Sequence, residues 1–397
     1  MTDKRSTSLE SDKPPNPQGL RPAPWRIALV ANLRDDLPWD PTAPPDAGAE
    51  FDRPETLEAL TEALESDGHY VHFLAADSTL PEALTKLRPH IVFNIAEGLG
   101  GDAREAHVPA LLELLRTPYT ASRVLAHALS LDKVKTKRIW KSVGLPTPRF
   151  WEFSSEAEAS RASPRYPVFV KPSREGTGMG IDAGAVVKSK RELVRRVAWV
   201  TRTYLQPALV EEFLPGREFT VGFLGRPGPR EGRRRPWLYD DLGYHFFPVL
   251  EIDSQAAVSP GVYGHDAKAA DLEDEGAPGY LCPADIPESL RAQLVDLARQ
   301  AAEAIGTLDV ARIDFRLGVD GQPSLLEINT LPGLNPTVSD LCMMATAEGM
   351  PYRTLITEIL YLAADRYGLP FTPKVLPDSA EGALATRYSP VTIAASR

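Results

Sequence analysis

The stretch 309–335 restricts the fold of this chain more than any other, because apolar and polar residues alternate on both sides of a tight-turn signal. The alternating runs are Val310–Leu317 and Ser324–Ile328. Between them lies Asp320-Gly321, a dipeptide that favours the turn of a β-hairpin. The pattern therefore predicts two antiparallel strands joined by a short turn.

The predicted hairpin gathers polar side chains on one of its faces. Side chains alternate between the two faces of a strand, so Arg312, Asp314 and Arg316 share a face of the first strand. Glu327 and Asn329 share a face of the returning strand, where they can lie beside Asp314. Two carboxylates and an amide oxygen are hard ligands, and with open coordination positions they suit Mg²⁺ that also binds phosphate. The alternative is a surface hairpin whose polar face meets only water.

Length and composition indicate a globular protein with several lobes. The 397 residues are too many for one simple core and suggest two or three domains. The net charge of −10 argues against a general nucleic-acid-binding surface. The only cysteines, Cys282 and Cys342, form neither a metal motif nor a disulfide framework. The sequence shows no membrane-spanning run and no signal-peptide core, so we expect a cytoplasmic protein.

The first part of the chain alternates apolar runs with helical and loop segments, which predicts an open α/β sheet. A helix is expected at Pro54–Ser66, and strands at Trp25–Ala31, Val71–Leu74 and Ile91–Ile95. Ligands of such sheets bind beyond the carboxyl ends of the strands. The glycine-rich loop 97–101 after the third strand is therefore a candidate binding edge, although its glycines fit plain turns equally well.

Two segments in the middle of the chain have features of anion binding. Leu131–Val143 has the pattern of a basic helix with a lysine at every fourth residue, for which a solvated lysine face is the commoner explanation. The apolar run Tyr166–Lys171 predicts a strand that leads directly into the glycine-rich loop 172–180. Backbone N–H groups of such a loop can point at an anion, but the loop matches neither GxxxxGK[ST] nor a helix-opening GxGxxG. A flexible glycine flap over phosphates fits it better.

The second half of the chain is predicted to contain further strands and one long helix. The strands are expected at Leu209–Phe213, Glu218–Leu224 and Phe247–Ile252, and the amphipathic helix at Ser289–Ile305. The basic, turn-rich segment 225–236 is interpreted as an exposed hairpin loop, because it lacks the interleaved aromatic residues of a nucleic-acid patch.

Several motifs occur together along the chain: FNIAEGLGGDAREAHVPALLELLRTPYTAS, LDKVKTK, VFVKPSREGTGMGI, VEEFLPGREFTVGFLG, and RIDFRL followed by LLEINTLPGLNP. With these motifs the chain resembles the ATP-grasp superfamily and, within it, the D-alanine–D-alanine ligase family, from about Trp25 to about Tyr367. Any one motif is weak evidence, but all of them in family order and near family spacing argue against a chance match.

The resemblance implies an ATP-grasp fold of the α/β class, in which two antiparallel sheets clamp ATP. The expected parts are an N-terminal α/β lobe over 24–122, a central lobe over 123–210 and a C-terminal lobe with the metal site over 211–371. The remaining segments, 1–23 and 372–397, are expected to be a disordered tail and a loosely held tail.

The resemblance also assigns roles in the nucleotide and metal sites. Lys137 and Lys171 would contact the phosphates or the adenine edge. Glu211 would accept a hydrogen bond from the adenine amino group, and Glu218 would hold the ribose hydroxyls. The apolar wall and backbone edge at the base would come from Phe213 and Leu214. Mg²⁺ (or Mn²⁺) would be held by Asp314, Glu327 and Asn329.

The implied reaction forms an amide bond in two steps. A substrate carboxylate attacks the γ-phosphate of ATP to give an acyl phosphate, and an amine then attacks the acyl carbon through a tetrahedral intermediate. Arg312 and the backbone N–H of Gly333 would stabilise the oxyanion of that intermediate. Lys268 would neutralise the transferring phosphate from a segment that closes over the site, and Thr177 corresponds to the serine of the family's glycine flap.

Several positions depart from the family pattern, and they bear on the substrates. The proline-rich loop Asn32–Ala49 replaces a glycine–glycine turn and its nearby amine-binding glutamate, for which Glu50 or Asp52 could stand in. Glu97 lies where the family has a histidine, and we hypothesise that it recognises an amine. Ser339 lies near the family serine that binds the second substrate's carboxylate, with one residue of extra spacing.

Three functions are compatible with these residues. The first is a ligase like D-alanine–D-alanine ligase, with D-alanine as a candidate substrate and peptidoglycan biosynthesis as the process. The second is an amino-acid or dipeptide ligase of specialised biosynthesis with other substrates. The third is a non-catalytic ATP-binding regulatory protein, against which Arg312, Asp314 and Glu327 argue. The expected partners are ATP, Mg²⁺ and small carboxylate and amine substrates, without nucleic acid or membrane, and the family implies a homodimer.

Overall fold

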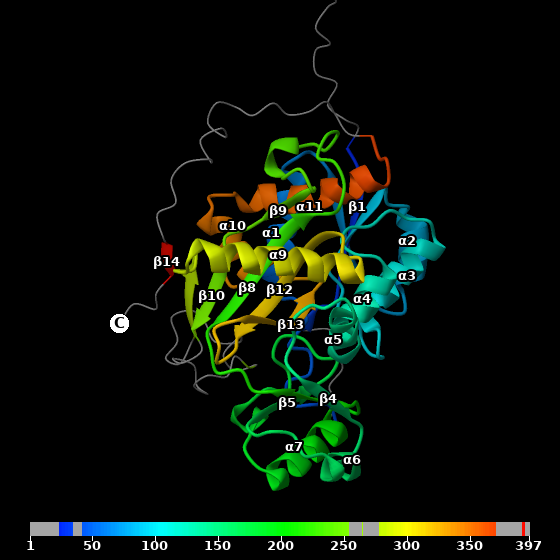
Figure 1. Cartoon of the computed structure of the whole chain (residues 1–397). Coiled ribbons are helices and arrows are strands. Elements are labelled where there is room, and N and C mark those ends of the chain that lie inside the picture. The colour runs from blue at the N-terminus through cyan, green and yellow to red at the C-terminus, as the bar shows by residue number, and fades with distance from the viewer. Residues whose placement is uncertain (1–23, 35–41, 254–263, 265–277, 371–390, 394–397) are drawn as a thin grey trace, which may run out of the picture.

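The computed structural model describes residues 24–34, 42–253, 264, 278–370 and 391–393. The predictions for the tail 1–23 and for Lys268 lie outside these residues. Within them the chain forms three β-sheets with accompanying helices (Figure 1). The predicted C-terminal tail contains a short strand, β14 (Val391–Ile393), which pairs with β11 (Gly279–Cys282).

The N-terminal sheet has three parallel strands in the order β2–β1–β3, which confirms the predicted open α/β sheet. Its strands are β1 (Arg26–Ala31), β2 (Tyr70–Ala75) and β3 (Ile91–Asn94). Its first helix begins with a proline, which the first helical turn tolerates, and buries a leucine stripe on one side. The helices of this part are α1 (Pro54–Glu65), α2 (Leu80–Leu87), α3 (His107–Leu114) and α4 (Val124–Leu131).

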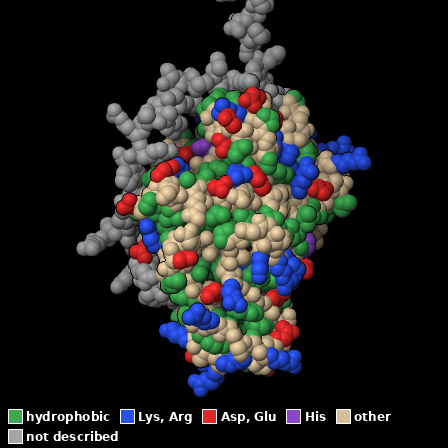
Figure 2. Space-filling view, in the orientation of Figure 1, with side chains coloured by type: hydrophobic (Ala, Val, Ile, Leu, Met, Phe, Trp, Pro, Cys, Tyr) green, Lys and Arg blue, Asp and Glu red, His purple; other side chains and the backbone are tan. Residues whose placement is uncertain are grey.

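A four-stranded antiparallel sheet in the order β4–β7–β5–β6 forms the central part. Its strands are β4 (Phe150–Phe153), β5 (Val168–Pro172), β6 (Val186–Val187) and β7 (Ala208–Glu212). Helices α6 (Glu156–Arg161) and α7 (Lys190–Thr203) lie together on the side of this sheet that faces away from the rest of the molecule (Figure 1). Basic side chains are prominent on this end of the face shown in Figure 2. The predicted lobe boundary between 210 and 211 falls within β7.

The largest sheet has seven strands, with β13–β12–β8–β10–β11–β14 in sequence across it and β9 paired to β8. The strands not yet given are β8 (Glu218–Gly225), β9 (Tyr244–Phe246), β10 (Leu250–Asp253), β12 (Asp309–Leu317) and β13 (Pro323–Asn329). The helices of this part are α5 (Lys133–Ser142), α9 (Glu288–Ile305), α10 (Asp340–Ala347) and α11 (Tyr352–Arg366).

Helices cover both faces of this sheet, and strand β8 is therefore buried along its whole length. Phe219 and Phe223 of β8 belong to one buried cluster with Leu294 of α9. Leu224, whose side chain points to the other face, belongs to a second cluster with Leu360 of α11. Strands buried on both faces carry apolar residues at successive positions, as β8 does.

The hairpin predicted from the sequence is confirmed as β12–β13. Asp314 pairs with Glu327 across the two strands, and Arg312 pairs with Asn329. The register shifts between Asp314 and Phe315, a bulge that was not predicted. The strand predicted at Phe247–Ile252 begins later, at Leu250, because pairing with β8 starts at that residue.

Two other predictions concern loops and cysteines. The segment 225–236 is not simply exposed: Arg233 is 3% exposed and its guanidinium donates hydrogen bonds to the carbonyl oxygens of Gly243 and Arg226. Cys282 and Cys342 are buried free thiols. None of the helices in the described part of the chain is both long enough and apolar enough to cross a bilayer.

Candidate active site

Two cavities meet at the β12–β13 hairpin. The first is a cleft between the four-stranded and seven-stranded sheets, and Glu211 of β7 and Asp314 and Glu327 of the hairpin line it. The second is a larger cavity of about 350 Å³, lined by Arg312 and Asn329 of the same hairpin and by loops of the N-terminal part. Arg312 and Asp314 alternate with apolar residues along β12, so both side chains lie on the same face of the strand. On that face, Arg312 lines the larger cavity and Asp314 lines the cleft.

A buried network of charges centres on Glu211. Lys137 Nζ lies 2.6 Å from Glu211 Oε1, and Lys171 Nζ lies 3.2 Å from Glu211 Oε2. Burial opposes ionisation of Glu211, but the charges of the two lysines outweigh it and lower the pKa of this carboxyl. Burial lowers the pKa of Lys137 to about 8 in spite of the pairing. The interpretation of the basic helix as a solvated lysine face is therefore wrong for Lys137, which is 0% exposed, and for Lys133, which is 7% exposed.

The other residues predicted to contact the nucleotide line the same cleft. Phe213 and Leu214 follow strand β7, and Glu218 begins β8. Glu218 Oε2 is 3.2 Å from Arg316 Nη1, so this carboxylate is already held by a cation on the neighbouring strand β12. Lys171 and Glu211 line this cleft too, whereas Lys137 does not line it and lies behind Glu211 in their ion pair.

The predicted metal ligands lie side by side on the hairpin. Asn329 Nδ2 donates a hydrogen bond to Asp314 Oδ2 at 3.3 Å. Glu327 Oε2, on the partner strand, lies 3.5 Å from Lys133 Nζ and 3.7 Å from Lys171 Nζ. Among the described residues no group of three or more His, Cys, Asp and Glu side chains could hold a metal ion, but the predicted set consists of two carboxylates and one amide. Hard oxygen donors beside lysines, at the edge of a cleft, fit Mg²⁺ that shares its ligand sphere with phosphate.

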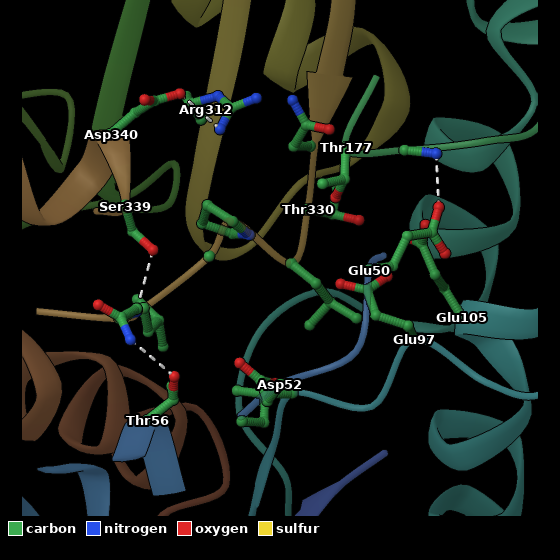
Figure 3. A pocket seen from close by; sticks show the side chains of 18 of the residues that line it. Glu50, Asp52, Thr56, Glu97, Glu105, Thr177, Arg312, Thr330, Ser339 and Asp340 are labelled. Atoms are coloured by element: carbon green, nitrogen blue, oxygen red, sulfur yellow. Dashed lines mark hydrogen bonds and ion pairs between the residues drawn. The ribbon is translucent and has the colours of Figure 1, made fainter. Parts of the chain in front are cut away.

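Two carboxylates hold Arg312 in place. Arg312 Nε and Nη2 donate to Asp314 Oδ1 and Oδ2, each at 3.0 Å, and Nη1 lies 2.9 Å from Asp340 Oδ2. Gly333 lines the same cavity, and a Cβ atom there would lie only 2.8 Å from Ser339 Oγ, so the loop packs closely because this residue is glycine. Figure 3 shows Arg312, Ser339 and Asp340 together on one side of the cavity.

The glycine-rich loop is fastened to the N-terminal loop 42–53. The Gly176 N–H donates to Glu50 Oε1 at 2.5 Å, and the Gly180 N–H donates to Asp46 Oδ2 at 2.7 Å. Thr177 has a φ of 48° and lines the larger cavity. Glu50, which the sequence offers as an amine ligand, therefore already accepts a hydrogen bond from the glycine loop.

Four carboxyl groups form a wall of the larger cavity, which we call the acidic wall: Glu50, Asp52, Glu97 and Glu105. Figure 3 shows Glu50, Glu97 and Glu105 on the side of the cavity opposite Arg312. Burial, reinforced by the charges of Glu105 and Glu50, raises the pKa of Glu97 well above its ordinary value. Burial raises the pKa of Asp52 to about 7, and burial together with the Glu50 charge raises that of Glu105 to about 8.

Four residues of the site were not predicted from the sequence: Arg104, Glu105, Lys133 and Asp340. The guanidinium of Arg104 donates to Glu50 Oε2 at 2.7 Å and to Glu175 Oε2 at 2.9 Å, which joins the N-terminal part to the glycine loop. Of these four residues, only Lys133 could have been found from the sequence, because it lies one helical turn before Lys137 on the same helix face. The other three depend on contacts between segments that are distant in the sequence.

The chain is similar in sequence and in fold to known proteins. The family model described as D-ala D-ala ligase C-terminus matches residues 139–361. A D-alanine–D-alanine ligase of Aquifex aeolicus is 34% identical over 77% of this chain and 94% of its own length. An uncharacterised protein, y4sG, of Sinorhizobium fredii is 34% identical over 78% of this chain and 88% of its own length. The crystal structure of D-alanine–D-alanine ligase from Bacillus anthracis complexed with ATP shares the fold, with a TM-score of 0.63, 17% identity, and coverage of 87% of this chain and 99% of that one.

Proposed function

The chain belongs to the D-alanine–D-alanine ligase family, and on this premise we propose that it is an ATP-dependent ligase that joins a carboxylate to an amine. ATP, a carboxylate and an ammonium would yield ADP, phosphate, an amide and a proton. The observation that carries the proposal is the hairpin, which lines one cavity with Asp314 and the other with Arg312. A protein that only binds nucleotide needs no partly buried arginine in a second cavity, which argues against a regulatory function.

In the first step, a substrate carboxylate oxygen in the larger cavity attacks the γ-phosphorus of ATP in the cleft, and the bond to the bridging oxygen of ADP breaks. Phosphoryl transfer depends mainly on positioning and on stabilisation of charge, which Lys171 supplies from β5. Asp314, Glu327 and Asn329 would hold Mg²⁺ (or Mn²⁺), which neutralises phosphate charge when bound. The adenosine contacts assigned to the cleft are Glu211, Phe213, Leu214 and Glu218. Lys137, assigned to the phosphates or the adenine edge, pairs with Glu211 behind the cleft.

In the second step, the amine nitrogen attacks the acyl carbon, phosphate leaves with its bonding electron pair, and the nitrogen loses a proton. The guanidinium of Arg312 and the Gly333 N–H would stabilise the oxyanion. Because Asp314 and Asp340 already orient the guanidinium, little reorganisation is needed when the charge develops. Thr177 is assigned to the glycine flap over the phosphates, and Ser339 to the carboxylate of the second substrate. Lys268, outside the described residues, keeps the role inferred from the family.

D-alanine is the first substrate to test, because the relatives are named for it, and with it the process would be peptidoglycan biosynthesis. Other amino acids or dipeptides come second, and the acidic wall favours them because it differs from the family pattern around Glu97. We also propose a cytoplasmic homodimer, as in many family members. Light scattering on the purified protein measures that assembly directly.

Substitutions of the predicted metal ligands test the proposed function. Asp314→Asn and Glu327→Gln are each expected to lower amino-acid-dependent ADP release about 100-fold or more, because each removes a negative oxygen ligand while keeping the shape of the side chain. Their thermal melting curves should stay close to that of the wild type. Glu58→Gln, on the exposed side of α1, is the matched control and should retain full turnover. Near-normal turnover by either ligand variant would refute the assigned role.

A further inference from the structure

The acidic wall contains more carboxyl groups than one amino-acid substrate requires. An α-ammonium has three N–H donors, which one or two carboxylates can satisfy. Glu50 is already held by Arg104 and by the Gly176 N–H. Asp52, Glu97 and Glu105 remain to face the cavity, so the excess has to be explained by the ligand or by protonation.

Within the described part of the chain, none of these three carboxyl groups forms an ion pair with a lysine or arginine. The nearby charge of Arg104 partly offsets the raised pKa of Glu97 and Glu105, and that of Lys133 partly offsets the pKa of Glu105. The side chains of Asp52 and Glu97 make no hydrogen bond or ion pair among the described residues, and the ion-pair contact of Glu105 is with His127, at 4.0 Å. Burial lowers the pKa of His127 to about 4, so the imidazole is neutral near pH 7 and adds no positive charge. All three side chains are partly buried. Carboxylates that are shielded from water are normally paired, and a cation brought by a ligand would complete these three.

A separate observation comes from the strand that leads to Glu97. Asn94, at the end of β3, lines the same cavity and is 1% exposed. Its Oδ1 accepts a hydrogen bond from the Ala96 N–H at 3.3 Å, but among the described residues its Nδ2 group finds no acceptor. An unused amide donor suits a carboxylate or carbonyl oxygen. The cavity thus offers an unused donor close to unused acceptors, as expected for a ligand that carries both an oxygen acceptor and ammonium groups.

We propose that the larger cavity selects a substrate with a second ammonium group besides its α-ammonium, that is, a diamino acid or a short peptide that contains one. The inference rests on the proposed ligase function and names its substrate class. Glu97, Glu105 and Asp52 would bind the two ammonium groups through charge-assisted hydrogen bonds. The alternative is that these carboxyl groups stay protonated and bind a neutral side chain.

Matched pairs of amino acids distinguish the two cases. The pairs are 2,4-diaminobutyrate with 2-aminobutyrate and ornithine with norvaline, each as both enantiomers, at saturating ATP and Mg²⁺. We expect kcat/KM for ADP release to be at least about tenfold higher for the diamino member, the size of one charge-assisted hydrogen bond. Glu97→Gln and Glu105→Gln should reduce that ratio, whereas Glu58→Gln should not. Equal values for both members with the wild-type protein would overturn the inference and leave the ligase function standing.

Calorimetry separates the inference from the proposed function. 2,4-Diaminobutyrate and 2-aminobutyrate are titrated into the full-length protein with Mg²⁺ and a non-hydrolysable ATP analogue, in two buffers with different ionisation enthalpies. We expect the diamino acid to bind about tenfold tighter and to release protons, because its charge favours the ionised carboxylates. Tighter binding without any turnover would support the inference and refute the ligase. The affinity of each Gln variant for the ATP analogue reports whether that variant is folded.

Discussion

Arg312 contacts Asp314 on its own strand and Asp340 at the start of α10, so carboxylates hold its guanidinium from two directions. A cation held in this way stabilises a developing negative charge without first having to move. Its neighbour Asn329 lines the same cavity, whereas Asp314 lines the nucleotide cleft. Arg312 is therefore expected to act mainly on acyl transfer, after ATP has reacted.

Arg312→Lys tests this division of labour. The lysine keeps a positive charge beside Asp314 and Asp340 but loses the fixed fork of donors, so we expect amide formation to fall about 100-fold or more. The acyl phosphate should still form, and hydroxylamine should trap it as a hydroxamate at a rate closer to that of the wild type. A variant that loses hydroxamate formation and amide formation to the same extent would contradict the assignment of Arg312 to the second step.

The raised pKa of Asp52 allows a prediction of how the stability of the protein depends on pH. Burial raises its pKa from 3.8 to about 7, so its contribution to stability is full below about pH 4 and is lost as the pH rises through 7. For this partly buried side chain we expect a loss on the order of 1 to 2 kcal/mol between pH 5 and pH 8. Asp52→Asn should make the melting temperature less dependent on pH over that range. The Glu58→Gln control should show the same pH profile as the wild type.

At the scale of elements, the β12–β13 hairpin and the glycine loop show what the sequence can and cannot reveal. The two-residue period of Val310–Leu317 was sufficient to place Asp314 beside Glu327, because register follows from alternation and a turn. No glycine or proline next to Asp314 signals the bulge after this residue in the sequence. The bond from Gly176 to Glu50 joins residues 126 positions apart, and no local pattern encodes such a contact.

The contact between loop 42–53 and the glycine loop gives the element-scale prediction. Asp46 accepts hydrogen bonds from the Gly180 N–H at 2.7 Å and from the Tyr204 hydroxyl at 2.9 Å. Asp46→Asn should weaken both bonds and cost about 1 to 2 kcal/mol of local stability. Trypsin should then cleave faster after Arg174, as followed by mass spectrometry. Glu65→Gln, at the exposed end of α1, is the control and should leave the cleavage rate unchanged.

At the scale of the whole molecule, the three sheets are not joined equally. Residues of β1 and α1 share one buried cluster with residues of β12, α10 and α11, so the N-terminal and seven-stranded sheets are built on a common core. The buried cluster of the four-stranded sheet instead draws on its own strands and on α6 and α7. Movement between parts should therefore occur mainly where the four-stranded sheet meets the rest of the molecule.

Arg366 of α11 is one of the ties within the common core. Its Nη2 donates to Asp309 Oδ2 at 2.7 Å and to the carbonyl oxygens of Tyr119 and Ala121, each at 3.0 Å. Arg366→Met would leave the fully buried Asp309 carboxylate unpaired and should cost about 3 to 5 kcal/mol in the free energy of unfolding. The double variant with Asp309→Asn should lose less than the sum of the single changes in denaturant titrations. Additive losses would show that the two side chains act independently.

The spacing of Arg312 and Asp314 along β12 also sets a length for the chemistry. The Cα atoms of residues two positions apart on a strand are roughly 7 Å apart, and the Arg312 guanidinium meets the Asp314 carboxylate at 3.0 Å. The two cavities therefore meet within the span of a small acyl phosphate. A reactive anhydride made at one of these residues would already reach the other without leaving the protein. The hairpin would then hold the sites of phosphoryl transfer and acyl transfer at a fixed short distance. The acyl phosphate would react with the amine before water could hydrolyse it.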